Sequence, residues 1–126
     1  MAVETIAWII QILLALLFVM AGILKMTQPI EKLKQRMTYV ESLSPASTRV
    51  IGALELAGGL GLILPMLTNI LPWLTPLAAL GLVLTMIGGA LLHVVRKEYA
   101  LIGINVVLLG LAAFVLYARF DLLPLA

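Results

Sequence analysis

The sequence contains no cysteine among its 126 residues, and charged residues make up only 11% of it. The absence of cysteine excludes disulfides, thiol catalysis, thiolate metal ligands and iron–sulfur clusters within the chain. The hydrophobic fraction of 63% also departs from a water-soluble domain, which is about 45–50% apolar and about 25% charged. A mean hydropathy of +1.20 agrees with this. The composition therefore predicts a protein that lies in a lipid bilayer.

Motifs of soluble enzymes and of nucleic-acid binders are also lacking. The sequence has no glycine-rich phosphate loop, no nucleophile at motif spacing from a histidine and an acid, and no basic aromatic surface. With one histidine and no cysteine, a metal or haem site within one chain is not expected, although a dimer would change that ligand count. We expect no nucleic-acid partner and no covalently bound cofactor.

Four apolar stretches of about 20 residues occupy most of the chain, and each is long enough to cross a bilayer as a helix. We place them at about residues 5–24, 50–67, 76–95 and 99–119. The first is interpreted as a retained helix, because Glu4 stands where a signal peptide has positive charge and the apolar run is too long. The predicted fold class is therefore all-α. It is a four-helix transmembrane bundle that forms a single membrane domain over residues 1–126.

The connection between the first and second spans has the periodicity of a surface helix. Pro29 is suited to the first turn of such a helix. Apolar residues then recur at helical spacing, opposite the basic ones: Ile30, Leu33, Met37 and Val40. We therefore expect a short amphipathic helix within residues 29–43 that lies flat in the membrane interface. A solvated loop with a little periodicity is the alternative.

Basic residues are distributed unevenly between the two ends of this bundle. With four spans, the first and third connections share one side, and that side holds seven of the eight lysines and arginines. Both termini share the other side with Arg119. The positive-inside rule then places the basic connections in the cytoplasm and both termini outside. Trp8 and Trp73 fall at the outer interface, where indole rings are enriched, or else they pack against lipid or core.

Small residues indicate where membrane helices meet, because close packing drives their association. Two helical faces combine small residues with an ionisable one: Gly81, Thr85, Gly89 and His93 in the third span, and Gly52, Glu55 and Gly59 in the second. We expect these glycines to serve helix packing rather than ligand approach. The same spacing predicts that Glu55 points into the bundle.

Five polar residues fall at a similar depth in the half of the bundle near the basic connections: Lys25, Arg49, Glu55, His93 and Asn105. With a rise of 1.5 Å per residue, Glu55 lies roughly 9 Å deeper than the helix start at Arg49. An ionised group at membrane depth costs about 2.5–3.5 kcal/mol, so Glu55 needs a partner, water or a proton. We expect the five residues to form a ligand-binding site. An acid beside a histidine suits proton transfer or recognition of a ring carbonyl or hydroxyl.

Each member of the cluster has a structural alternative. Glu55 can be protonated and simply link two helices through hydrogen bonds. Lys25 and Arg49 can extend to lipid phosphates at the helix ends, and His93 can be an interfacial residue. The convergence of the five residues in one layer is what favours a site.

Several segments together resemble a known family. They are Ala21-Gly22-Ile23-Leu24-Lys25 at the end of the first helix, the block from Arg49 to Pro65, Leu74-Thr75-Pro76-Leu77-Ala78-Ala79, and His93. The sequence resembles the DoxX-like family of small four-helix membrane proteins over nearly its whole length. The block from Arg49 to Pro65 is the specific part of this resemblance.

The resemblance implies a multi-pass protein of the prokaryotic cytoplasmic membrane that is associated with redox systems. Such systems include a quinone-linked thiosulfate oxidoreductase subunit and relatives near disulfide-forming machinery. Lys25, Arg49, Glu55 and His93 match the family pattern, which supplies no agreed catalytic residues. We expect an accessory subunit of a redox or quinone-linked system whose polar cluster binds a quinone or a similar lipophilic molecule.

Two other functions stay open at this point. One is a purely structural or assembly subunit of a larger membrane complex, and the other is an oligomeric transporter for a small solute. The expected partners are membrane lipids and either such a complex or further copies of the chain.

Overall fold

The computed structural model describes residues 2–124, which form helices and their connections. Four helical segments in it are long and apolar enough to span a membrane. They are α1 (Ala2–Thr27), α3 (Pro45–Gly61) followed by α4 (Leu64–Thr68), α5 (Leu74–Val95) and α6 (Tyr99–Ala118). The predicted all-α class and the four spans are therefore confirmed over the described residues. The chain is a multi-pass membrane protein that contacts lipid.

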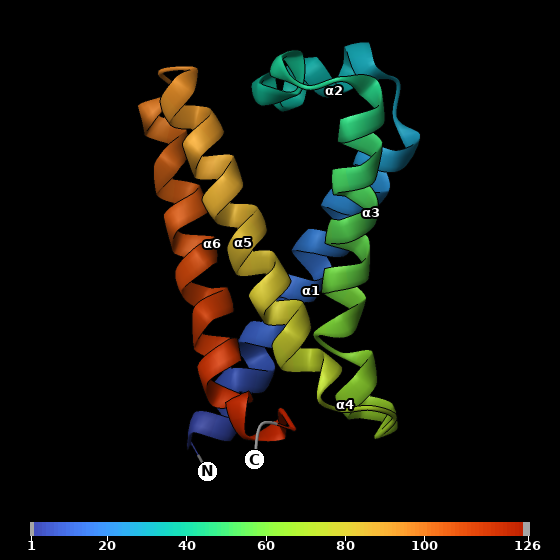
Figure 1. The fold of residues 1–126 in the computed structure, drawn as a ribbon, viewed down its shortest axis with the longest axis vertical. Coiled ribbons are helices and arrows are strands. Elements are labelled where there is room, and N and C mark those ends of the chain that lie inside the picture. The colour runs from blue at the N-terminus through green and yellow to red at the C-terminus, as the bar shows by residue number, and fades with distance from the viewer. Residues whose placement is uncertain (1, 125–126) are drawn as a thin grey trace.

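The spans pair into two antiparallel units. α1 packs along α3, and α5 packs along α6. The two pairs cross near the termini and diverge toward the opposite end, as Figure 1 shows. Both ends of the chain lie at the crossing end (Figure 1). The opposite end, which we call the basic end, carries seven basic residues: Lys25, Lys32, Lys34, Arg36, Arg49, Arg96 and Lys97.

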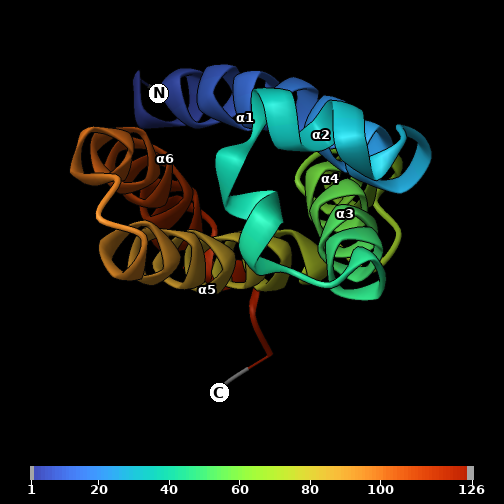
Figure 2. The same cartoon turned by 90° about the horizontal axis from the view of Figure 1, so that it is seen from above.

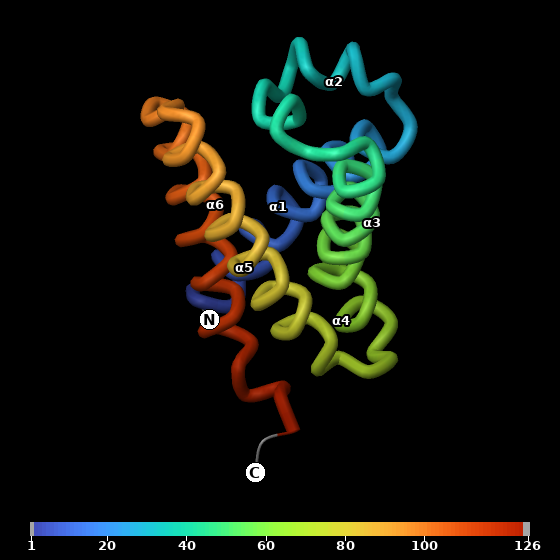
Figure 3. Tube along the Cα trace, turned by 45° about the horizontal axis from the view of Figure 1, so that its top comes forward, coloured from blue at the N-terminus to red at the C-terminus, as the bar shows by residue number. Residues whose placement is uncertain are grey.

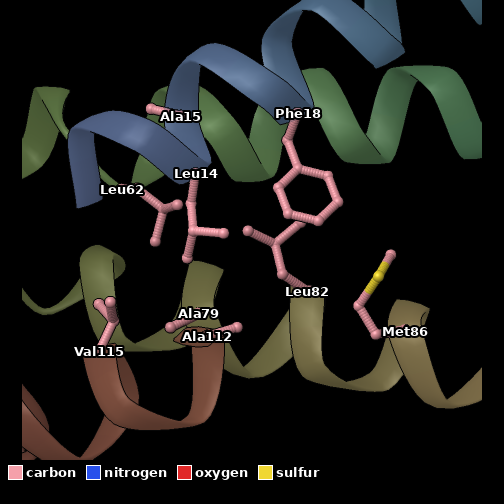
Figure 4. Packing of buried hydrophobic residues seen from close by; sticks show 9 residues of the cluster. All are labelled: Leu14, Ala15, Phe18, Leu62, Ala79, Leu82, Met86, Ala112 and Val115. Carbon is pink, nitrogen blue, oxygen red and sulfur yellow. The ribbon is translucent and has the colours of Figure 1, made fainter. Parts of the chain in front are cut away.

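The apolar core lies where the two pairs cross. Figure 4 shows Leu14 and Phe18 of α1 directed at side chains of α5 and α6, among them Leu82 and Val115. These four side chains are at most 2% exposed. Large apolar side chains on the outer helix faces are exposed, as is expected where helices contact lipid.

The connection between α1 and α3 crosses the basic end of the molecule. It contains α2 (Ile30–Arg36) and a short 3-10 helix, η1 (Thr38–Ser42). Figures 2 and 3 show this connection passing over the space between the two helix pairs. We call residues 29–43 the strap. The predicted interfacial helix is present, but it breaks at Met37 and is held by the buried Leu33 and Val40.

The second span is interrupted, in contrast to the continuous helix predicted for residues 50–67. Pro65 lies in the first turn of α4 and does not end the span. Because proline has no N–H, it cannot donate to Gly61 four residues earlier. Thr75 Oγ1 donates to that carbonyl at 2.9 Å instead, and Gln11 Nε2 donates to the Leu62 carbonyl at 2.6 Å. Side chains from neighbouring helices thus satisfy the backbone where the helix breaks.

Small residues bring α1 and α3 into backbone contact. A Cβ added at Gly22 would lie 2.6 Å from the Gly52 carbonyl oxygen, and one at Gly59 would lie 3.1 Å from the Ala15 carbonyl oxygen. On the third span, the glycines at positions 81 and 89 were expected to serve helix packing, and only one of them does so. Gly89 abuts Asn105, whereas a Cβ at Gly81 would meet nothing within 4 Å.

Candidate functional site

Lys25 and Glu55 form a buried ion pair between the first two membrane helices. Lys25 Nζ donates to Glu55 Oε1, and the two side chains are 6% and 3% exposed. Gly22 and Gly52 lie one turn from them and let the helices touch, because a Cβ at Gly52 would lie 2.7 Å from Lys25 Cβ. The partner that Glu55 needs at this depth is therefore the lysine of the adjacent helix.

Arg49 has a different position from the other residues of the predicted cluster. Its Nη1 donates to the backbone carbonyls of Lys25 at 2.8 Å and Gln28 at 2.6 Å. The first carbonyl lies in the last turn of α1 and the second directly follows that helix, where no further helical N–H is available to them. Arg49 thus caps α1 and holds it against the start of α3.

His93 is paired with an acid that the sequence reasoning did not select. His93 Nδ1 lies 3.1 Å from Glu98 Oε1 in the turn between α5 and α6. That turn is a Schellman motif, in which Glu98 N–H donates to the His93 carbonyl and Lys97 N–H donates to the Val94 carbonyl. Lys97 adopts φ 60°, a position that glycine usually fills. The motif folds the Glu98 side chain back onto the histidine.

Glu98 also ties the strap to the second helix pair. Thr38 Oγ1 of the strap donates to Glu98 Oε2 at 2.6 Å, and Arg96 Nε donates to Oε1 at 3.0 Å. The Thr38 hydrogen bond, followed by those of Arg96 and His93, lowers the pKa of Glu98 to about 2. Arg96 in turn donates to Ser42 Oγ at 2.5 Å. At neutral pH an ionised Glu98 therefore holds the strap in place.

Tyr39 lies on the strap between the Lys25–Glu55 pair and His93. Its ring centroid is 5.1 Å from Lys25 Nζ and 5.6 Å from the His93 ring centroid, with the two rings nearly perpendicular. Burial raises the pKa of the Tyr39 phenol. The phenol is therefore neutral at physiological pH and spans the distance between the two helix pairs.

Asn105 completes the polar layer from α6. Its Nδ2 donates to the Met86 carbonyl of α5 at 3.3 Å and fills the space left by Gly89. Because that carbonyl only accepts, the amide oxygen of Asn105 is directed away from it.

A cavity of about 840 Å³ lies beneath the strap, between the diverging helix pairs. Four residues of the predicted cluster line it, namely Lys25, Glu55, His93 and Asn105, and Arg49 does not. Tyr39 also lines the cavity. The rest of the wall is largely apolar: Leu17, Phe18, Ile51, Met86, Leu92, Leu101, Ile104 and Leu108. An apolar cavity with a few polar groups at one level has the form of a small-molecule site.

Tyr39, Thr38 and Glu98 were missed by sequence reasoning for identifiable reasons. Tyr39 and Thr38 stand in a polar connection whose path was not predicted. Glu98 stands in a tight basic turn with no glycine to indicate a Schellman motif. One feature of the sequence indicates this pairing. His93 stands at the end of its helix, so an acid in the following turn lies within its reach.

A second buried polar cluster lies at the crossing end. Arg119 Nε donates to Gln11 Oε1 at 2.8 Å, and Arg119 Nη1 donates to Glu4 Oε2 at 2.7 Å. The guanidinium also lies 5.5 Å from the Trp8 ring. These contacts join α1 to the end of α6.

Within residues 2–124 no group of three or more histidine or acidic side chains is arranged to hold a metal ion. The polar layer therefore offers hydrogen bonds and charge. It does not offer a metal coordination shell.

Comparison with known proteins identifies a protein family that this sequence matches. The model of the DoxX-like family matches residues 9–115, which include the second and third spans, most of the first and fourth, and every polar residue lining the cavity. No curated protein and no solved structure matches the sequence. The chain belongs to the DoxX-like family of membrane proteins.

Proposed function

We propose that this protein is a small accessory subunit of a membrane redox system and that the cavity under the strap binds a quinone or a similar lipophilic molecule with a polar head. The observation that carries the proposal is the joint placement of Lys25, Glu55, Tyr39, His93 and Asn105 around a largely apolar cavity of about 840 Å³. The association with redox systems rests on the family resemblance.

The shape and chemistry of the cavity support this class of ligand. A volume of about 840 Å³ lies within the range of about 300–1,000 Å³ that is typical of small-molecule sites. The polar groups lie near the basic end, where a head group sits close to water. The apolar wall descends toward Phe18 and Met86 at the core, and it suits a ring and the first part of a hydrocarbon tail.

The polar residues have distinct roles in this proposal. Lys25 keeps Glu55 ionised in a membrane environment, and Glu55 and His93 contact oxygens of the ligand head and exchange protons with it. Asn105 orients the head from α6, and the Tyr39 ring covers it from the strap. Arg49 acts from outside the cavity by holding the end of α1 beside Lys25.

Because the chain has no cysteine, one introduced thiol can report on the cavity. Leu108→Cys places a thiol in the cavity wall, and Val107→Cys places one on the exposed face of the same helix. In lipid nanodiscs a short-chain benzoquinone whose four ring positions are all substituted, so that it does not add to thiols, should slow maleimide labelling of the first thiol at least several-fold and leave the second unchanged. Equal slowing of both thiols, or of neither, would contradict the proposal.

Site variants in the Leu108→Cys background test the assigned residues. His93→Phe and Asn105→Leu should weaken protection by the benzoquinone, because each removes a polar group from the cavity wall. Leu91→Ala, at a 61% exposed residue of α5, is the matched control and should keep protection intact. If the benzoquinone protects the thiol as well in both cavity variants as it does in the control, the site is assigned to the wrong residues.

The location and the orientation in the membrane are also proposals. The seven basic residues at the basic end favour the cytoplasmic side for the strap, with both termini outside. In intact bacterial cells an impermeant maleimide should label Phe120→Cys, which lies near the C-terminus, and should not label Lys97→Cys. The opposite result would invert the topology.

The alternative functions predict different outcomes from the same preparations. A purely structural subunit keeps its partner complex and shows no protection by any quinone tried. A transporter requires a stable oligomer, because four helices enclose little volume, so native mass spectrometry of the nanodisc protein should then show several copies.

A further inference from the structure

Three of the polar side chains that line the cavity carry a hydrogen-bond acceptor with no partner among residues 2–124. Glu55 is the clearest case, because its carboxylate is 3% exposed and Lys25 bonds to only one of its oxygens. Oε2 has no hydrogen-bond partner among residues 2–124. An ionised carboxylate accepts and cannot donate, so Oε2 is satisfied only by a donor.

His93 presents a second acceptor when its imidazole is neutral. Glu98 is ionised at neutral pH and can only accept, so the His93 nitrogen that faces it, Nδ1, carries the proton. The other ring nitrogen, Nε2, is then an acceptor. It has no hydrogen-bond partner within the described part of the chain.

Asn105 presents the third acceptor. Its amide nitrogen is directed at the Met86 carbonyl, which fixes the orientation of the amide group. Its Oδ1 has no hydrogen-bond partner within the range 2–124.

The donors nearest to these acceptors are already engaged by protein groups. Lys25 is held against Glu55 and the Tyr39 ring, and Thr38 donates to Glu98. Arg36 lies on the exposed side of the strap, at the mouth of the cavity. The Tyr39 hydroxyl, which also lines the cavity, lies 3.8 Å from Met37 Sδ. The three acceptors described above stay open to a ligand.

We propose, building on the proposed function, that the site selects a lipophilic molecule whose head carries a hydrogen-bond donor, such as a phenolic hydroxyl. For a quinone-type ligand this is the dihydroxy, reduced form. A donor head satisfies Oε2 of Glu55, which a ligand in the cavity would cut off from water, whereas a head with only carbonyl or ether oxygens leaves that oxygen unpaired and faces it with another acceptor. Leaving a buried polar group unpaired is the most unfavourable outcome for hydrogen bonding in such a site.

A redox-inert pair of probes isolates the donor. A para-alkyl phenol and its methyl ether share ring and tail and differ in one O–H, so their partition into lipid is closely matched. Protection of the Leu108→Cys thiol in nanodiscs gives the apparent affinity of each. The phenol should bind roughly tenfold more tightly, as expected for one hydrogen bond to a charged acceptor.

A double variant removes the main acceptor without leaving an unpaired charge. Lys25→Met with Glu55→Leu replaces the buried pair by apolar side chains of similar size. The preference for the phenol should fall to within about twofold, while the ether still binds. The matched control is Lys34→Met with Glu31→Leu, which removes the exposed ion pair of α2 and should keep the full preference.

The outcomes separate this proposal from the function on which it rests. If the phenol, its methyl ether and the benzoquinone all fail to protect the thiol, the proposed function is wrong, and so is the donor preference that rests on it. If both probes protect equally in the wild-type chain, the cavity binds lipophilic rings and the donor preference is wrong. A preference that survives the double variant overturns the assignment to Glu55.

Discussion

The ring of Tyr39 stands nearly perpendicular to the ring of His93, with an interplanar angle of 83° and centroids 5.6 Å apart. Tyr39 belongs to the strap, which is continuous with the α1–α3 pair, and His93 belongs to α5. The contact therefore crosses the space between the two helix pairs. Together with the hydrogen bonds of Glu98, it closes the basic end of a cavity that the diverging helices leave open.

Glu98→Gln should loosen the strap. The substitution removes the charge that strengthens the hydrogen bonds from Thr38 and Arg96, so residues 38–42 should open more often. Amide hydrogen exchange of η1 in nanodiscs should become roughly tenfold faster, while exchange in the α1 core stays unchanged.

Glu31→Gln is the matched control for that change, because Glu31 is an 84% exposed acid on the strap that pairs with Lys34 of the same helix. Its η1 exchange should equal that of the wild type. Unchanged exchange in Glu98→Gln would show that the apolar contacts of Leu33 and Val40 hold the strap by themselves.

Acidification should release the same contact at low pH. The pKa of Glu98 is lowered from 4.5 to about 2, first by the Thr38 hydrogen bond. A group whose pKa is depressed in the folded state stabilises that state fully above its unfolded value, and the contribution is lost as the pH falls toward the folded value. The stabilisation should therefore be present above about pH 4.5 and decline between about pH 4.5 and 2.

Carboxyl carbon NMR of selectively labelled protein measures this titration directly. The Glu98 signal should have its midpoint near 2, and the Thr38 resonances should move with it. A Glu98 midpoint near 4.5 would show that the hydrogen bonds to the strap do not persist in solution.

Breaking the buried ion pair should be far more harmful than replacing it. Lys25→Met alone leaves the Glu55 carboxyl group buried without its partner, which should lower the free energy of unfolding by about 3–5 kcal/mol. Lys25→Met with Glu55→Leu should recover most of that loss. Thermal unfolding in detergent compares the two variants, and equal losses would mean that the pair itself contributes the stability.

Close packing of α1 on α3 should depend on Gly22. A Cβ at this position would lie 2.6 Å from two backbone atoms of α3, which cannot move as a side chain can. Gly22→Ala should therefore destabilise the protein by about 1–3 kcal/mol through forced separation of the helices. Gly103→Ala is the control, since a Cβ there meets nothing within 4 Å, and its unfolding temperature should be unchanged or slightly raised.

The interruption of the second span was not predicted from the sequence. The sequence predicts one uninterrupted helix over residues 50–67, whereas in the structure Pro65 lies in the first turn of the separate short helix α4. The sequence marks the missing hydrogen bond at Pro65, but it does not show that Thr75 supplies a donor for the Gly61 carbonyl. That donor comes from the packing of α5 against α3.

For a similar reason, the structure brings together only some of the residues that were predicted to form the site. Four of the five selected residues line one cavity because helical spacing and distance along each span fix their depth and face. Arg49 lies at the expected level, but its long side chain reaches the carbonyls at the end of α1. Depth follows from residue number, whereas the direction of a flexible side chain depends on which acceptors lie around it.

The sequence by itself determined the four spans and the uneven distribution of basic residues, because the length of an apolar run is sufficient for a helix to cross a bilayer. Only the tertiary structure decided the pairing of Lys25 with Glu55, of His93 with Glu98, and the position of Tyr39 between them. These contacts depend on how closely glycines let α1 approach α3, on a Schellman turn with lysine in place of glycine, and on the path of the strap. The helix approach and the path of the strap depend on distances between segments far apart in the chain, which residue spacing within one segment does not encode. The Schellman turn is local, but it has no glycine to indicate it.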